Sequence, residues 1–208
     1  MEINFATLFY LFLRLAPFVL VCFFSLLSIF NFDLKGVVYL VGVIITMTVS
    51  IVLGNLITAI FPNIIQKPDG LLCDIINLSS SIPSLPIGQS IIGFTSAYLI
   101  STLYFNDSNY KNNAILNNWP TIAFFSILVI CDIYWNNFKN KCYGKLHSLI
   151  TYGSSIAVGI LWSSIIFDTK TPSLQFFPKY KNNELCKRAS EKTFKCRVYR
   201  GGKLVGSV

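Results

Sequence analysis

Long runs of apolar residues, separated by short polar segments, make up most of the chain. A helix needs about 20 mostly apolar residues to cross a bilayer. Five stretches have this length and composition, at about residues 5–30, 37–61, 87–105, 119–135 and 149–167. The pattern therefore predicts an all-α polytopic membrane protein with about five transmembrane helices. The connection at 31–36 is short, so we expect the first two helices to form a tight antiparallel pair.

Two charged residues interrupt these apolar runs. Arg14 lies in the first run, and no convincing cleavage site follows it, so we expect a retained membrane helix rather than a cleaved signal peptide. Asp132 lies in the fourth run, where an acid commonly has a functional or paired role. Because Lys139 follows within two turns, we expect Asp132 to reach toward the membrane surface near that lysine.

Basic residues are concentrated at the C-terminal end. Residues 1–168 hold seven basic and seven acidic side chains, whereas residues 169–208 hold ten and two, so the net charge of +8 lies in the last forty residues. Basic segments favour the cytosolic side of a membrane. We therefore expect a transmembrane helical bundle over 1–168 and a basic soluble tail over 169–208 on the cytosolic side. The loops 62–86 and 136–147 would then lie on the opposite, lumenal side.

The tail contains a pattern that is typical of a β-hairpin. Residues 193–200 alternate between apolar and basic side chains, Gly201-Gly202 suits a tight turn, and 203–208 is again extended and apolar. A flexible solvated tail is the alternative. A hairpin this short needs a partner surface to be stable.

Composition excludes several classes of protein. Only 12% of the residues are charged, about half the share that is typical of a soluble domain, and 53% are hydrophobic, which argues against a disordered chain. The six cysteines are scattered, without the paired spacing of a zinc site. We expect them to be small buried hydrophobic residues, and we expect neither a metal nor another cofactor.

Two polar clusters, at 82–90 and 140–147, open the third and fifth predicted helices on the same side of the membrane. Gly88 lies at the start of a helix, where backbone N–H groups can bind an anion. Three nitrogen donors could surround a phosphate-sized anion at this side: Lys67, Lys141 and His147.

These clusters resemble motifs of the type-2 phosphatidic acid phosphatase superfamily of membrane enzymes. Residues 140–147 (Asn-Lys-x5-His) are similar to its Ser-Arg-x5-His motif, with Lys in place of Arg. Residues 86–90 (Pro-Ile-Gly-Gln-Ser) are similar to its Pro-Ser-Gly-His motif, with Gln in place of His. Residues 66–70 (Gln-Lys-Pro-Asp-Gly) resemble an Arg-Pro-Asp-Gly stretch of some members. The order and spacing agree over about residues 50–165, although the leading Lys of the first motif has no clear counterpart.

The resemblance implies a role for each matched residue. His147 stands where the family's nucleophile attacks phosphorus, and Gln89 stands where its proton donor lies. A Gln amide has no proton to give, so general acid catalysis, worth about 10²–10⁴-fold, should be missing. Lys141 keeps a charge for phosphate but loses the bidentate Arg fork. The implied phosphate-binding residues are Lys67, Gly88, Ser90 and Lys141.

We therefore expect a catalytically degenerate member with a structural or docking role. Its bundle would lie in the lipid bilayer, and its tail would bind a protein lattice or capsid, or anionic lipid, rather than nucleic acid. Richness in Asn, Ile, Lys and Phe suggests an AT-biased genome, which suits a minor capsid or inner-membrane component of a large DNA virus. One alternative is an active lipid-phosphate or polyprenyl-diphosphate phosphatase that uses His147 as nucleophile. A small channel or transporter is another.

Overall fold

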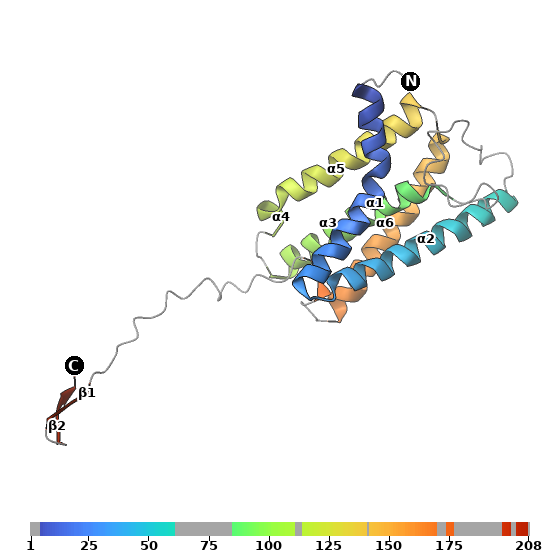
Figure 1. The fold of residues 1–208 in the computed structure, drawn as a ribbon. Coiled ribbons are helices and arrows are strands. Elements are labelled where there is room, and N and C mark those ends of the chain that lie inside the picture. The colour runs from blue at the N-terminus through green and yellow to red at the C-terminus, as the bar shows by residue number, and fades with distance from the viewer. Residues whose placement is uncertain are drawn as a thin grey trace.

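The computed structural model describes residues 5–60, 85–110, 114–140, 142–169, 174–176, 197–200 and 203–207. The helices are α1 (Phe5–Asn31), α2 (Lys35–Ile60), α3 (Ile87–Tyr110), α4 (Ala114–Asn117), α5 (Trp119–Ile133), the π-helix η1 (Tyr134–Lys139) and α6 (Lys145–Asp168). Two strands follow, β1 (Arg197–Arg200) and β2 (Lys203–Ser207). Figure 1 shows the long helices gathered in one bundle.

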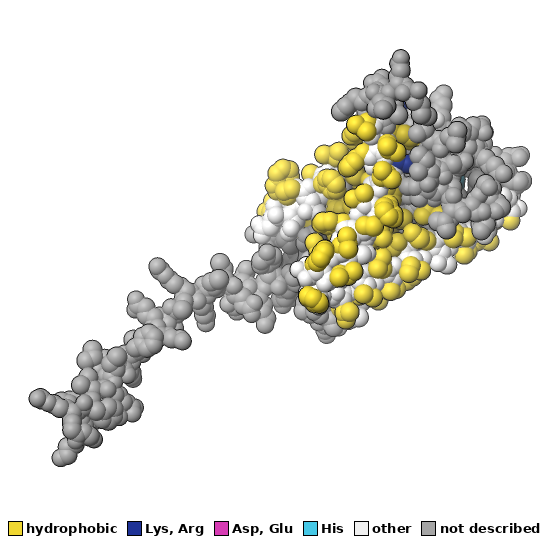
Figure 2. Space-filling model, viewed as in Figure 1, with side chains coloured by type: hydrophobic (Ala, Val, Ile, Leu, Met, Phe, Trp, Pro, Cys, Tyr) yellow, Lys and Arg dark blue, Asp and Glu magenta, His cyan; other side chains and the backbone are white. Residues whose placement is uncertain are grey.

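Within the described part of the chain, four segments are long and apolar enough to cross a membrane. They are Leu8–Asn31, Lys35–Ile60, Trp119–Lys139 and Lys145–Asp168. Hydrophobic side chains cover the outward face of α1 and α2 (Figure 2), as expected of a surface that contacts lipid. The length and composition of these helices confirm the prediction of an all-α membrane protein.

The remaining long helix, α3, lies at the centre of the bundle. It contacts α1, α2, α5 and α6, and its contact with α6 is the most extensive in the bundle. Its side chains are largely buried, including Ile92, Phe94 and Leu103. Because neighbouring helices shield α3 from lipid, it can carry polar residues such as Ser90 and Thr95. The predicted third span is therefore a helix, but it is less apolar than the other four and extends beyond residue 105.

Glycines allow α3 and α6 to approach closely. A Cβ atom on Gly159 of α6 would lie 2.9 Å from the Ala97 Cβ and 2.9 Å from the Phe94 carbonyl oxygen of α3. A Cβ on Gly93 of α3 would overlap the Ser155 hydroxyl of α6. Small residues are typical of tight helix contacts in membranes, where van der Waals packing drives association.

Hydroxyl pairs join the same helices. They are Ser50–Ser90 at 2.7 Å and Tyr39–Thr95 at 2.8 Å between α2 and α3, and Thr102–Ser163 at 3.0 Å between α3 and α6. Such interhelical hydrogen bonds satisfy polar groups that lipid cannot. They fix the relative rotation of the three helices.

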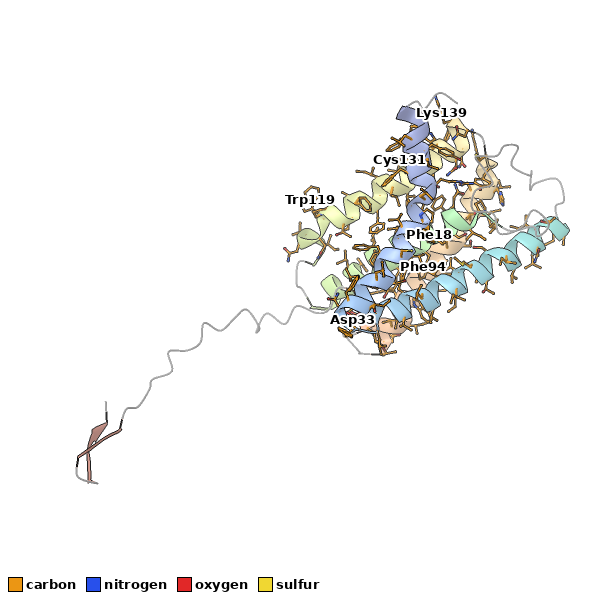
Figure 3. The ribbon with its side chains drawn as sticks, in the orientation of Figure 1. Phe18, Asp33, Phe94, Trp119, Cys131 and Lys139 are labelled. Atoms are coloured by element: carbon orange, nitrogen blue, oxygen red, sulfur yellow. The ribbon has the colours of Figure 1, made fainter. Side chains whose placement is uncertain are left out.

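Successive long helices run in alternating directions, so the bundle has two distinct ends. Asp33, in the turn between α1 and α2, and Lys139, at the end of η1, lie at opposite ends (Figure 3). We call the end near Lys139 the polar end, because Arg14 of α1 there contacts Tyr143 just before α6. We call the other the tail end, because α6 finishes there. The start of α1 and the end of α6 are thus at opposite ends of the bundle.

Residues 174–176 pack against the bundle at the tail end. The Phe176 ring lies 4.9 Å from the Phe24 ring, 6.2 Å from Tyr39 and 6.5 Å from Tyr98, in edge-on contacts. These aromatic rings belong to α1, α2 and α3. Although residues 174–176 fall within the predicted tail, Leu174 and Phe176 pack against the hydrophobic core.

The strands β1 and β2 pair in antiparallel orientation. Arg197 is opposite Ser207 and Arg200 is opposite Lys203, with an irregular register between Val198 and Tyr199. The beginning of the predicted first strand, at 193–196, and the predicted glycine turn lie outside the described residues.

Candidate functional site

A buried carboxylate, Asp132 of α5, lies at the centre of a polar cluster near the polar end. Its side chain is 3% exposed. It accepts hydrogen bonds from Gln89 Nε2 (3.1 Å), Asn136 Nδ2 (2.8 Å) and the Tyr152 hydroxyl (2.7 Å). These donors come from α3, η1 and α6, so the carboxylate joins four helical segments.

This position corrects the prediction that Asp132 reaches toward the membrane surface near Lys139. The Asp132 carboxylate points into the bundle, whereas the Lys139 side chain is exposed. The physical reason is that three hydrogen-bond donors from neighbouring helices replace the water molecules that would otherwise solvate the carboxylate. A carboxylate needs such partners inside a bundle, because an unsatisfied buried charge is very costly.

Gln89, the first residue of the cluster on α3, is bonded at both ends of its amide. Its Nε2 donates to Asp132, and its Oε1 accepts a 3.0 Å hydrogen bond from the Ser148 hydroxyl of α6. The side chain is 1% exposed. Gln89 therefore links α5 to α6 and keeps a fixed orientation.

Arg14 brings a positive charge from α1 to the same end of the bundle. It is 5% exposed, and its terminal nitrogen donates a 2.8 Å hydrogen bond to the Tyr143 hydroxyl. The guanidinium carbon lies 5.5 Å from the centre of the Tyr143 ring, within the range of a cation–π contact. Arg14 is also close enough to Asp132 to interact electrostatically. Opposite charges near each other reduce the cost of burying either one.

Tyr10, one turn before Arg14, joins α1 to η1 and to the segment between η1 and α6. Its hydroxyl donates a 3.3 Å hydrogen bond to Asn136 Oδ1 and lies 3.4 Å from Cys142 Sγ. The Cys142 amide donates to the Asn136 carbonyl oxygen (2.8 Å).

Cys142 is disulfide-bonded, so the expectation of simple buried thiols is wrong for this residue. Cys22 and Cys131 are free and partly buried.

His147 lies in the first turn of α6, beside the cluster. Its side chain is 4% exposed, and the centre of its ring is 5.9 Å from that of Tyr143 in an edge-on arrangement. Within the described part of the chain, neither ring nitrogen has a hydrogen-bond partner. A buried imidazole whose two nitrogens lack hydrogen-bond partners can still bind a polar group or a proton.

The structure brings only some of the predicted site residues together. Gln89 and His147 lie at the same end, joined through Ser148, which follows His147 in the chain. The Ser90 hydroxyl instead bonds to Ser50 of α2 and to the Pro86 carbonyl oxygen. Gly88 faces α1, since a Cβ there would lie 3.3 Å from Pro17. Two further predicted residues, Lys67 and Lys141, lie outside the described residues.

Several members of the cluster were not among the predicted site residues. Arg14 and Asp132 each had a sequence signal, because a charged residue inside a membrane helix usually has a function or a partner. Asn136 and Tyr152 had none, since both are common near membrane surfaces. Only the packing of η1 and α6 around α5 directs them at the carboxylate.

Among the residues that the structure describes, no group of three or more His, Cys, Asp or Glu side chains could hold a metal ion. In comparisons with known proteins, no family model, no curated protein and no solved structure matches the chain.

Proposed function

We propose that the chain is a catalytically degenerate protein similar to the type-2 phosphatidic acid phosphatases, with a structural role in a membrane. Its bundle anchors it in the bilayer, and its basic tail docks on a protein lattice at the cytosolic side. The inner membrane of a large DNA virus, with the chain as a minor capsid component, fits this role. The motif spacing at 86–90 and 140–147 supports the family.

The observation that carries the proposal is the hydrogen bonding of Gln89. In the resembled enzymes this position supplies the proton for the leaving alkoxide. Here the side chain has no titratable proton, and both ends of its amide are engaged, with Asp132 and Ser148. Gln89 is thus suited to holding helices together and unsuited to acid catalysis.

The environment of His147 supports the same conclusion. An activated nucleophile is usually held by a base or by an orienting group within hydrogen-bond distance. Asp132, the nearby carboxylate, is occupied by Gln89, Asn136 and Tyr152 rather than by His147. Nothing in the described residues therefore orients the imidazole for attack.

The distribution of charge supports a docking role for the tail. Residues 1–168 are neutral overall and present an apolar surface, which suits lipid and offers little for recognition outside the membrane. Residues 169–208 carry the net charge of +8. The β1–β2 pair adds strand edges, which can extend a partner sheet through backbone hydrogen bonds.

One observation favours the alternative of an active lipid-phosphate or polyprenyl-diphosphate phosphatase. His147 is buried, and neither of its ring nitrogens has a hydrogen-bond partner among the described residues. Its ring contacts Tyr143, which accepts a hydrogen bond from Arg14. A nucleophilic imidazole beside a cation could act on a phosphate if another group replaced the missing acid.

Phosphate release from lipid phosphates and polyprenyl diphosphates by the purified protein separates the two functions. We expect no hydrolysis that depends on His147, as judged against a His147→Ala variant. Gln89→His should raise turnover if the rest of the pocket is intact. Robust hydrolysis by the unmodified protein that His147→Ala abolishes would establish the enzyme and contradict the proposal.

The docking role is tested by cross-linking in the native membrane particle. A chain that ends at Phe176 keeps the residues that pack on the bundle, so it should insert normally and lose its cross-links to the lattice. A tail of equal length and charge in shuffled order separates strand pairing from charge. Undiminished cross-linking of the shortened chain at moderate salt would assign docking to the bundle instead.

A further inference from the structure

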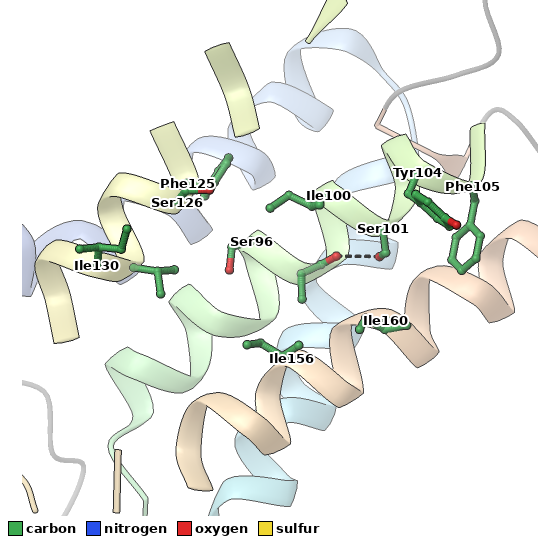
Figure 4. A pocket seen from close by; sticks show the side chains of 12 residues that line it. Ser96, Ile100, Ser101, Tyr104, Phe105, Phe125, Ser126, Ile130, Ile156 and Ile160 are labelled. Carbon is green, nitrogen blue, oxygen red and sulfur yellow. Dashed lines mark hydrogen bonds between the residues drawn. The ribbon is translucent and has the colours of Figure 1, made fainter. Parts of the chain in front are cut away.

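An apolar groove of about 760 Å³ lies between α3, α5 and α6 (Figure 4). None of the residues that bind the Asp132 carboxylate lines it. Ala97 and Ile100 of α3 form part of its floor. Its walls include Ile130 of α5 and Ile160 of α6, both of which are exposed on the outside of the bundle. Because α5 and α6 are membrane-spanning, the groove faces the hydrocarbon of the bilayer.

Two of the serine hydroxyl groups that line the groove have hydrogen-bond partners. Ser96 donates a 2.8 Å hydrogen bond to the Ile92 carbonyl oxygen, and Ser101 donates a 2.6 Å hydrogen bond to that of Ala97. Both partners are in α3 itself, so the serines expose little unsatisfied hydrogen-bonding capacity. The groove therefore suits a hydrocarbon chain better than a polar ligand.

The groove extends from the middle of the bundle, at Ile130 and Ile156, toward the tail end, at Tyr104 and Phe105. It follows α3 from Ser96 to Phe105. The Phe105 ring contacts that of Phe167, near the last residue of α6, with ring centres 5.6 Å apart. Tyr104, another lining residue, is 58% exposed, and its amphipathic ring suits the membrane interface. A lipid acyl chain in this groove would thus come from the leaflet at the tail end.

The charge of the tail selects the kind of lipid in that leaflet. Phe176 packs at the tail end, which is also the end of the groove's outer part. Residues 177–208 contain nine basic and two acidic side chains. Clusters of basic residues beside a membrane attract anionic lipids.

We propose that the groove between α3, α5 and α6 holds one acyl chain of an anionic phospholipid from the leaflet at the tail end. The volume lies within the range of about 300–1,000 Å³ that is usual for ligand pockets. This site is separate from the polar cluster and does not depend on whether the protein hydrolyses phosphate. Its occupant is a structural lipid rather than a substrate.

The test uses the full-length protein in nanodiscs that contain phosphatidylcholine and phosphatidylglycerol. In one experiment the phosphatidylcholine carries a photoreactive group on its acyl chain, and in a second experiment the phosphatidylglycerol does. Adducts are mapped by mass spectrometry. We expect them to concentrate at Ile130 and Ile160, to be more abundant from phosphatidylglycerol, and to lose this preference in high salt. Ser126→Phe fills the groove from α5 and should abolish the adducts. Ile127→Phe, at an exposed position outside the groove, should leave them unchanged.

Three results would overturn the proposal. Adducts spread evenly over the outer faces of the helices would mean that the groove holds only bulk lipid. Equal labelling by the two lipids at low salt would remove the anionic selectivity. Cross-links between two copies of the chain at Ile130 or Ile160, in place of lipid adducts, would assign the groove to a dimer.

Discussion

The Tyr152 hydroxyl donates a 2.7 Å hydrogen bond to Asp132 Oδ2, which joins α6 to α5 inside the bundle. Gln89 of α3 donates to the same oxygen atom at 3.1 Å. Three helices that are separated along the chain thus meet at one atom. Because lipid offers no alternative partner for these groups, the contact both stabilises the bundle and fixes its arrangement.

We expect Asp132→Ala to lower the free energy of unfolding in detergent by about 3–5 kcal/mol. The substitution leaves three buried donors without their acceptor and removes the negative charge near Arg14. Asp168→Ala is the control, since Asp168 is exposed at the end of α6, and its effect should stay within about 0.5 kcal/mol. Equal effects of the two substitutions in thermal unfolding would show that the cluster contributes little to stability.

Gln89 can be tested with two substitutions of different chemistry. Gln89→Leu removes the hydrogen bonds to Asp132 and Ser148 and should cost about 1–3 kcal/mol. Gln89→His keeps one donor and one acceptor, so it should retain most of the stability. Circular dichroism during thermal unfolding measures both. A Gln89→Leu protein as stable as the unmodified chain would contradict the structural role of this amide.

The close approach of α3 and α6 predicts a difference between two glycines of the same helix. Gly159→Ala forces a methyl group against the Phe94 carbonyl oxygen and Ala97, at a cost of about 1–3 kcal/mol. Gly153→Ala is the matched control, because no described atom lies within 4 Å of its Cβ position. Because Ala favours a helix more than Gly does, Gly153→Ala should raise the free energy of unfolding by up to about 1 kcal/mol. Unfolding midpoints that shift in the same direction would contradict the predicted contact.

Phe176 should contribute to the stability of the bundle although it follows the last helix. We expect Phe176→Ala to cost about 1–3 kcal/mol, less than the loss of a fully buried core Phe. Phe18→Ala, at a lipid-exposed position, serves as the control. A chain that ends at Phe167 should show the same loss, whereas a chain that ends at Phe176 should keep the full unfolding midpoint. If both shortened chains unfold alike, residues 174–176 do not hold the bundle.

Asp33 gives a pH dependence at the turn between α1 and α2. Burial raises the pKa of its carboxyl group, but hydrogen bonds from Lys35 and Ser28 outweigh this effect and lower the pKa overall. The Asp33 carboxylate lies 3.1 Å from the Lys35 ammonium group. A lowered pKa in the folded state stabilises the protein at pH values above the ordinary Asp pKa, and this contribution is lost as pH falls through the folded-state pKa.

An Asp33→Asn variant should therefore be less stable than the unmodified chain at neutral pH, by less than about 1 kcal/mol. The difference should disappear in acid, once the pH has fallen through the lowered folded-state pKa and the carboxyl group is protonated in both states. Unfolding midpoints of the two proteins across this range measure it. A difference that stays constant with pH would show that the carboxylate charge has no role.

The sequence by itself determined where the long helices lie, because a span depends on the local length of an apolar run. Of the five predicted spans, four are apolar enough in the described structure to cross a membrane. The predicted ends were less accurate. The π-helix η1 continues the fourth span to Lys139, and α6 begins at Lys145 rather than near Leu149. The backbone hydrogen bonds of a helix can continue through polar residues at the membrane surface, where hydropathy no longer marks them.

Only the tertiary structure decided which of these residues form the candidate site. The hydrogen bonds from Tyr10 to Asn136 and from Arg14 to Tyr143 join residues more than a hundred positions apart. Such contacts depend on the rotation and depth of each helix, which packing between side chains sets. Local hydrophobicity therefore determines that a helix can cross the membrane. The facing surfaces of all the helices together determine that a buried carboxylate, an arginine and a histidine lie at the same end.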